Sequence, residues 1–173
     1  MKTILNGQQL ALTVKRLAHQ ILENNLNLTD TVIIGLQPRG IFLSDRIVHE
    51  LKLINDPNII QYGKLDITFY RDDVRKSLHI ANTTDIPFSI ENKKVVLIDD
   101  VLYTGRTIRA ALDALLDFGR PSKVSLCVLI DRRFNRELPI QPDYTGKSID
   151  TIISQKVKVC WKENDVTEEV VLI

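Results

Sequence analysis

Hydrophobic residues recur every three or four positions in three segments of the chain, which is the spacing of an amphipathic helix. Residues 7–25 and 40–53 show this period, and so do residues 107–118. Gly119 and Pro121 follow the third segment in the order typical of a helix C-terminus. The three segments are therefore predicted to be α-helices.

Shorter apolar runs separate these helices, as strands do in an α/β protein. The strands predicted in this way are residues 31–36, 65–70, 94–98, 123–130, 157–161 and 166–172. Several of the runs are almost continuously apolar, which is typical of strands buried on both faces of a parallel sheet. The alternation of strands and helices predicts an α/β fold, with a central, mostly parallel sheet flanked by helices.

Residues 71–92 show no persistent period and contain charged residues, the run Asn82-Thr83-Thr84-Asp85 and Pro87. A stretch of this length inside a compact domain is usually functional or mobile. We therefore expect a flexible loop at about 71–92.

The composition indicates one domain with a hydrophobic core, because 173 residues with a hydrophobic fraction of 44% are ordinary for such a protein. The net charge of +1 gives no global nucleic-acid signature, so any RNA-binding face must come from local clustering. No segment reads as a signal peptide or membrane span, and Cys127 and Cys160 fall in apolar stretches as buried thiols would. These features predict a cytoplasmic protein without a membrane partner.

Residues 95–107, which read VVLIDDVLYTGRT, carry the clearest chemistry in the chain. Asp99 and Asp100 follow an apolar strand, at the edge where open α/β sheets bind ligands. Thr104 and Thr107 flank a turn before a helix N-terminus, which favours anions, and Gly105 lets the backbone approach the anion closely. Such a site can hold a sugar phosphate, whereas no lysine follows the glycine as a Walker A loop requires.

This motif resembles the phosphoribosyl-pyrophosphate (PRPP) signature of type I phosphoribosyltransferases and, in its long form, that of the PyrR family. Further matches occur at residues 66–73, 119–122, 136–140 and 144–147. The resemblance reaches from the first predicted helix to about residue 159. It implies the type I phosphoribosyltransferase fold for a single domain over residues 1–173, with a small hood built from the two chain ends.

The resemblance also implies an activity. PyrR proteins are bacterial regulators of pyrimidine biosynthesis genes that transfer the phosphoribosyl group of PRPP to uracil, giving UMP and pyrophosphate. They bind leader mRNA when UMP or UTP is bound, and they form dimers or larger homo-oligomers. One alternative is a phosphoribosyltransferase without the RNA-regulatory role, and another is transfer to a purine or to orotate.

The resemblance assigns roles to individual positions. The residues expected to bind PRPP or UMP are Pro38, Arg39, Gly40, Asp99, Asp100, Val101, Leu102, Tyr103, Thr104, Gly105, Arg106 and Thr107. The expected catalytic residues are Asp99, Asp100, Arg71 and Arg132, and the expected base pocket contains Tyr144 and Thr145. Arg39 suits a phosphate because its guanidinium is planar, whereas Pro38 offers no N–H. Tyr144 could equally be a core ring.

The chemistry of PRPP explains why a loop and a metal are expected. Departure of pyrophosphate leaves a cationic sugar that water would trap, so the loop that begins at Arg71 is expected to close over it. Mg²⁺ prefers oxygen ligands and keeps several waters. It is expected to arrive with PRPP, without a dedicated protein site, aided at most by Asp99 or Asp100.

Basic residues at scattered positions are the candidates for RNA binding. They are Lys15, Arg16, His19, Arg133, Arg136 and Lys147. Lys15 and His19 lie one helical turn apart and so share a face. The chain departs from the family pattern at several points. Pro38 stands where the family usually has Thr, and the loop after Arg71 is shorter than usual. Gln141 stands where a basic residue is expected, and Arg133-Phe134-Asn135 forms a small insertion.

Overall fold

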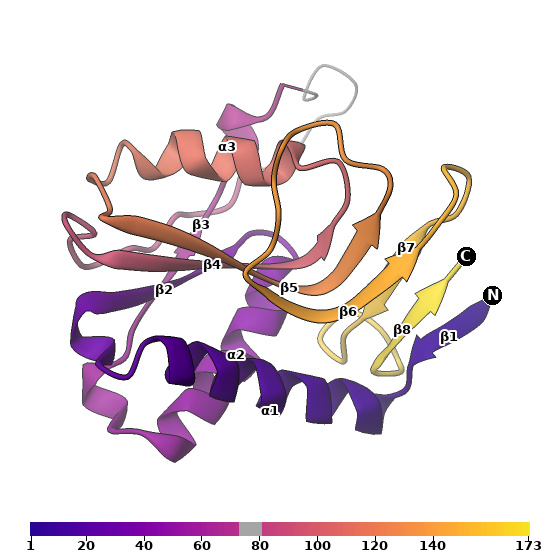
Figure 1. Ribbon diagram of the computed structural model, residues 1–173, viewed down its shortest axis with the longest axis horizontal. Helices are drawn as coiled ribbons and strands as arrows, with labels where there is room; N and C mark the ends of the chain where they lie inside the picture. The colour runs from indigo at the N-terminus through magenta and orange to yellow at the C-terminus, as the bar shows by residue number, and fades with distance from the viewer. Residues whose placement is uncertain (73–80) are drawn as a thin grey trace.

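Five parallel strands form the central sheet, in the spatial order β3-β2-β4-β5-β6 (Figure 1). The computed structural model describes residues 1–72 and 81–173. The strands are β2 (Thr31–Leu36), β3 (Gln61–Leu65), β4 (Lys94–Leu102), β5 (Lys123–Arg133) and β6 (Tyr144–Asp150). Three helices accompany them, α1 (Gly7–Asn24), α2 (Gly40–Ile54) and α3 (Arg106–Leu115). This mostly parallel sheet with flanking helices confirms the predicted fold class.

The helices cover opposite faces of the sheet, with α1 and α2 on one side and α3 on the other (Figure 1). Side chains alternate between these faces along each strand. Ile33 of β2 packs in the core beneath α1 and α2, whereas Val32 and Ile34 pack in the core beneath α3. Because both faces are covered, the inner strands β2, β4 and β5 contain long apolar runs, and this gives them a clear sequence pattern.

A second, smaller sheet brings the two ends of the chain together. It contains β1 (Lys2–Leu5), β7 (Val157–Cys160) and β8 (Glu169–Leu172), paired antiparallel in the order β1-β8-β7. In Figure 1 it lies beyond the arrowheads of the central strands, so it stands over the carboxyl edge of the main sheet. A loop that leaves that edge can therefore contact both sheets.

Trp161 lies where the smaller sheet meets α2, and its side chain is fully buried. The Arg46 guanidinium lies 4.6 Å from the centre of its ring, and the Phe42 ring packs beside it. Arg46 in turn forms ion pairs with Glu163 and Glu168 of the segment between β7 and β8. The indole N–H has no hydrogen-bond partner among the described residues.

The predicted strand at residues 65–70 is wrong. The strand β3 ends at Leu65, and Thr68–Tyr70 form a short 3₁₀ turn instead. The Asp66 carboxylate accepts hydrogen bonds from the backbone N–H and the hydroxyl of Thr68, at 3.4 and 2.8 Å. Such local side-chain bonding competes with strand pairing, and here it overrides the alternating pattern.

Among the described residues, three strands have no correct counterpart among the predictions, namely β1, β3 and β6. The strand β6 lies at the edge of the sheet and has a largely polar sequence, so it carries little of the apolar signal used to find strands. The C-terminal prediction was also too long, since β8 begins at Glu169 after a turn in which Asn164 and Asp165 donate backbone hydrogen bonds to the Trp161 carbonyl.

Both cysteines are buried and free, as the sequence suggested. Outside residues 73–80, the chain contains no helix that is both long enough and apolar enough to cross a membrane.

Gly146 of β6 offers a test of how closely α1 packs on the edge strand. A Cβ at this position would lie 2.4 Å from the Leu129 carbonyl oxygen and 2.8 Å from Thr13 Cγ2. Because the backbone of β5 cannot move away, we expect Gly146→Ala to lower the free energy of unfolding by about 1–3 kcal/mol in chemical denaturation. Ser148→Ala, an exposed position on the same strand, is the matched control. Equal stability of the two variants would contradict this packing.

Candidate active site

The strands β2 and β4 are neighbours whose following helices lie on opposite faces of the sheet. The chain leaves β2 towards α2 and β3, and leaves β4 towards α3 and β5. This divergence opens a crevice outside the carboxyl ends of the two strands, the usual place for a ligand in a parallel α/β sheet. The predicted PRPP-binding residues all belong to the carboxyl ends of these two strands, the loops that follow them and the first residues of α2 and α3.

Asp99 and Asp100 lie within β4, which continues to Leu102 and is longer than predicted. Both are buried, each with 7% of its surface exposed. Because successive residues of a strand point to opposite sides, the two side chains have different surroundings. Asp99 lines a cavity of about 270 Å³, whereas Asp100 forms an ion pair with Arg39 at 3.3 Å.

Burial of two adjacent carboxyl groups shifts their ionisation. Burial away from water is the main cause that raises the pKa of Asp99 to about 8, and the negative charge of Asp100 is the second cause. The nearby positive charges of Arg71 and Arg39 oppose this rise. Burial also raises the pKa of Asp100, and the Arg39 guanidinium opposes that rise. The site therefore favours ligands that donate hydrogen bonds or bring positive charge, because either would stabilise the carboxylates.

The turn after β4 forms most of the cavity wall. Tyr103, Thr104, Gly105 and Thr107 all line it, and Gly105 has a φ of 95°, a left-handed conformation that glycine adopts without strain. The first hydrogen bond along α3 runs from the Arg109 N–H to the Gly105 carbonyl, so the N–H groups of the preceding turn have no partner within the helix. Together with the helix dipole, they make an anion-binding wall beside Asp99.

The loop after β2 brings a guanidinium to the carboxylates. The Gln37–Pro38 peptide is cis, and α2 begins directly afterwards at Gly40. A Cβ on Gly40 would lie 2.7 Å from the Ile98 carbonyl oxygen, so glycine allows this close approach to β4. Arg39 donates to Asp100 and also to the Val159 carbonyl of the smaller sheet. Arg39 therefore connects both sheets at the site.

Arg71 lines the same cavity as Asp99. It follows the turn Thr68–Tyr70. The flexible loop predicted at about 71–92 lies partly outside the described residues, because residues 73–80 are not described. The described part places one further cation beside the carboxylate pair.

Two predicted site residues occupy other surroundings. Tyr144 has 6% of its surface exposed and belongs to the core beneath α1 and α2, where Asn25 donates to its hydroxyl at 3.2 Å. The alternative of a core ring is therefore correct for Tyr144. Thr145 points to the opposite face of β6 and lines a separate cavity.

Arg132 is 5% exposed and lines neither cavity. Its guanidinium lies 3.8 Å from the centre of the Tyr103 ring, and it donates to Thr151 Oγ1 at 3.0 Å and to the Gln155 carbonyl at 2.8 Å. These contacts correct the expectation that Arg132 faces the ligand directly. It supports the turn after β4 from behind.

Glu137 lines the cavity but was missed as a site residue. Its carboxylate accepts from Arg106 at 2.6 Å, and Asp72 accepts from the same guanidinium at 2.6 Å. Its backbone N–H also donates to the Thr104 carbonyl. Glu137 belongs to the run at 136–140 that carried part of the family resemblance, which was the signal available for finding it.

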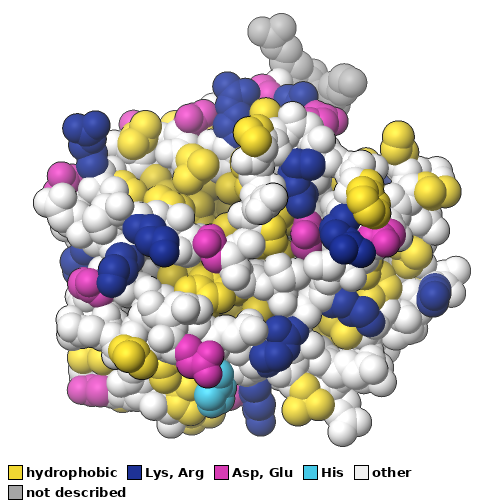
Figure 2. All heavy atoms as spheres, viewed as in Figure 1, with side chains coloured by type: hydrophobic (Ala, Val, Ile, Leu, Met, Phe, Trp, Pro, Cys, Tyr) yellow, Lys and Arg dark blue, Asp and Glu magenta, His cyan; other side chains and the backbone are white. Residues whose placement is uncertain are grey.

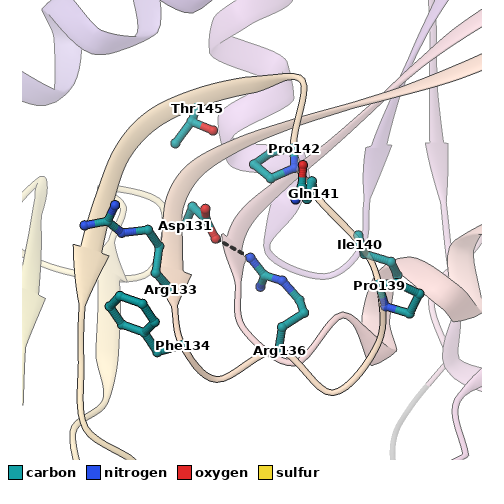
Figure 3. Close-up of a pocket in the computed structure, with 9 residues that line it drawn as sticks. All are labelled: Asp131, Arg133, Phe134, Arg136, Pro139, Ile140, Gln141, Pro142 and Thr145. Atoms are coloured by element: carbon teal, nitrogen blue, oxygen red, sulfur yellow. Dashed lines mark hydrogen bonds and ion pairs between the residues drawn. The ribbon is translucent and has the colours of Figure 1, made fainter.

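A larger cavity of about 660 Å³ lies between the end of β5, the loop after it and β6 (Figure 3). Arg136 points to Asp131 within it, and the two form an ion pair at 2.5 Å, drawn as a dashed line. Arg136 also donates to the Tyr103 carbonyl, so the wall of this cavity contacts the turn after β4. Arg133 and the exposed Phe134 lie at its other side.

The candidate RNA-binding residues extend from α1 across β6 to this cavity. Arg16 donates to the Thr145 and Gly146 carbonyls, and Lys147 donates to the Ile4 carbonyl, while Lys15 and His19 are exposed on α1. Figure 2 shows Lys and Arg side chains over this region, with acidic side chains between them. The acidic partners are Asp131 for Arg136 and Asp150 for Arg133.

The donor set fits a metal that arrives with its ligand. Among the described residues no group of three or more His, Cys, Asp or Glu side chains could hold a metal ion. Asp99 and Asp100 provide two hard oxygen donors at the crevice, which suits Mg²⁺ because this ion usually takes one or two carboxylates together with phosphate oxygens and water.

A family model described as "Phosphoribosyl transferase domain" matches residues 1–164 of the chain. "Bifunctional protein PyrR" from Latilactobacillus sakei is 45% identical over 170 residues, which is 95% of this chain and 93% of the relative. "Bifunctional protein pyrR" from Enterococcus faecalis is 43% identical over 175 residues, covering 99% and 96% of the two chains.

Solved structures support the fold at lower identity. A mutant hypoxanthine phosphoribosyltransferase from Trypanosoma cruzi, solved as a ternary substrates complex, superposes with a TM-score of 0.78 at 17% identity. The match covers 100% of this chain and 95% of that one. A hypoxanthine-guanine phosphoribosyltransferase from Bacillus anthracis gives a TM-score of 0.66 at 20% identity, covering 86% and 82%.

The buried carboxyl pair predicts a pH-dependent stability. An unfolded Asp99 regains a pKa of about 4, so between about pH 4 and about pH 8 the native state holds a proton that the unfolded chain has lost. The free energy of unfolding should therefore fall as the pH rises through this window. Asp99→Asn should flatten the fall and stabilise the ligand-free protein at pH 8 by on the order of 1–3 kcal/mol.

Thermal unfolding at pH 5 and pH 8 measures this effect, with Asp113→Asn on the exposed surface of α3 as the control. A lower melting temperature for Asp99→Asn at pH 8, or an unchanged pH slope, would be inconsistent with a strained carboxyl pair.

Proposed function

The chain belongs to the PyrR family of phosphoribosyltransferases, and we propose that it transfers the phosphoribosyl group of PRPP to uracil and regulates pyrimidine biosynthesis genes by binding RNA. The observation that carries the transferase activity is the buried pair Asp99 and Asp100 beside the N-terminal turn of α3, with Arg39 and Arg71 next to it. This arrangement offers separate places for a phosphate, a ribose and a pyrophosphate.

The 5′-phosphate occupies the turn between β4 and α3, where backbone N–H groups and the hydroxyls of Thr104 and Thr107 can donate to it. The ribose hydroxyls donate to Asp99 and Asp100, which favours the ionised carboxylates and so lowers their raised pKa values. The pyrophosphate then extends towards Arg39 and Arg71. Each part of PRPP thus lies beside protein groups of opposite charge or of complementary hydrogen-bonding capacity.

In the reaction, N1 of uracil forms a bond to the anomeric carbon while the bond from that carbon to the pyrophosphate oxygen breaks. Pyrophosphate leaves with the electron pair, and the N1 proton is released. The sugar passes through oxocarbenium character, which the carboxylates at the ribose can stabilise, whereas Arg39 and Arg71 stabilise the departing anion. The protein thus acts by positioning and electrostatics, without a covalent intermediate.

When bound together with PRPP, Mg²⁺ would supply positive charge that offsets the charge of the pyrophosphate. The residues that would hold it are Asp99 and Asp100, as loose partners of an ion carried by its substrate.

Arg132 contributes through Tyr103, because its guanidinium packs on that ring, whereas Arg132 itself does not line the 270 Å³ cavity. Thr145 stays a candidate for base recognition, since it lines the neighbouring cavity beside Asp131. Tyr144 is not proposed for this role, because its ring is part of the core.

Uracil is preferred to a purine or orotate as the acceptor base. The solved hypoxanthine phosphoribosyltransferases are only 17–20% identical to this chain, so they bear on its fold alone. The PyrR relatives are more than twice as similar over almost the whole chain.

The RNA-binding face in this proposal extends from Lys15, Arg16 and His19 of α1 to Lys147 of β6 and to Arg133 and Arg136. We place UMP or UTP in the transferase site as the effector, and a homo-oligomer, dimeric or larger, in the cytoplasm as the working form. A transferase that has lost RNA binding is the second candidate, favoured by the acidic partners of Arg133 and Arg136.

Purified protein with PRPP, Mg²⁺ and uracil should form UMP, with hypoxanthine and orotate as poorer acceptors. Asp99→Asn and Asp100→Asn should each lower kcat/KM by about 100-fold or more, because the ribose loses a charged acceptor in a buried site. Chromatographic detection of UMP measures the turnover of the wild-type protein and of the variants. A thermal-shift panel of PRPP, UMP, UTP and GMP measures ligand binding. No UMP from the wild-type protein, or full turnover by both variants, would refute the assignment.

RNA binding should depend on nucleotide and on salt. A pyrimidine-operon leader RNA should bind more tightly with UMP present, and Lys15→Ala and Lys147→Ala should each reduce the salt slope by about 1. Gel-shift titrations at several salt concentrations measure this, with Lys123→Ala at the start of β5 as the control. Binding that ignores UMP, or equal effects of all three variants, would favour the transferase without RNA regulation.

A further inference from the structure

The turn that carries Arg71 is fixed by a buried carboxylate that no part of the proposed mechanism uses. Asp66 is 8% exposed and follows β3. One of its oxygens accepts from the backbone N–H and the hydroxyl of Thr68, the first residue of the turn Thr68–Tyr70. Its other oxygen accepts from the backbone N–H of Asn82 at 3.2 Å. The two oxygens thus bind chain segments on either side of residues 73–80.

Further bonds hold these two segments together below Asp66. The Asp66 N–H donates to Thr84 Oγ1 at 3.0 Å, and Lys64 and Asp85 exchange a pair of backbone hydrogen bonds of 2.8 Å each. The side-chain amide of Gln37 donates to the Thr83 carbonyl at 2.7 Å. Since Gln37 begins the loop that carries Arg39, the supports of the two arginines are connected.

The far end of the turn is also attached, in this case to the region of α3. The Tyr70 hydroxyl donates to Asp117, and Asp72 pairs with Arg106 at 2.6 Å. Arg71 lies between Tyr70 and Asp72 in the chain, and it lines the cavity together with Asp99. Its position relative to the carboxylate pair therefore depends on how the turn is held.

We propose that Asp66 is a positioning residue for phosphoribosyl transfer, because its carboxylate fixes the turn that presents Arg71 to the pyrophosphate of PRPP. This inference rests on the proposed function. A carboxylate suits the task because both of its oxygens accept, and three donors converge on them. An amide has one accepting oxygen, so Asp66→Asn would place an NH₂ group against either the Thr68 donors or the Asn82 N–H.

In this proposal Asp66 affects the binding and reaction of PRPP but not the binding of UMP, because UMP lacks the pyrophosphate that Arg71 would contact. Asp66→Asn should lower kcat/KM for PRPP about tenfold, because displacement of a positioned group by a fraction of an ångström has effects of this size. The affinity for UMP, measured by thermal shift, should change by less than about twofold. Arg71→Ala should lower kcat/KM as well, and the double variant should be no worse than Arg71→Ala alone.

Asp56→Asn is the matched control, because the Asp56 carboxylate caps a similar short turn by accepting from Asn58 but reaches no second segment among the described residues. Thr68→Val is a milder second variant that removes one donor to Asp66 and should shift PRPP kinetics in the same direction. Equal losses of UMP and PRPP affinity, or losses that add fully to those of Arg71→Ala, would overturn the inference.

Failure of the proposal for Asp66 can be distinguished from failure of the proposed function. If the wild-type protein binds PRPP but forms no UMP from uracil, the proposed reaction fails, while the ratio of PRPP to UMP affinities still decides the role of Asp66. If the wild-type protein does not bind PRPP, both proposals fail.

Discussion

Two carboxyl groups buried side by side at the end of the central strand are the constraint around which the site is built. Asp99 and Asp100 have little contact with bulk water, and burial raises the pKa of both. A pair of this kind costs stability in the ligand-free protein, since the ionised forms lose hydration. Substrate hydroxyls and cations relieve that cost, so the strain favours binding of a ribose that carries charged groups.

Several cationic side chains around this pair are held by other parts of the chain. Arg39 reaches across to the Val159 carbonyl, which joins the smaller sheet to the carboxyl edge of the central one. Arg106 is shared between Asp72 and Glu137, and Arg136 joins the turn at Tyr103 to Asp131. Each of these guanidinium groups thus joins two segments of the chain at the crevice.

The sequence was sufficient where a local pattern decides the structure. The strand at residues 31–36, the helix starts and the acidic strand end followed by a glycine turn were all readable, because periodicity and turn chemistry act over a few residues. Partners that are distant in the sequence were not readable. Arg132 is buried because Thr151 and Gln155 bind it from another loop, and Tyr144 is in the core because its face of β6 meets α1.

The buried indole beneath Arg46 has a consequence for anyone who studies this molecule in solution. Trp161 is the sole tryptophan of the chain, and it lies where the terminal strands meet α2. Its emission should be blue-shifted in the native state, and it should respond when the covering sheet moves relative to the crevice. The protein therefore contains an intrinsic fluorophore whose emission follows the packing between the smaller sheet and α2 without any label.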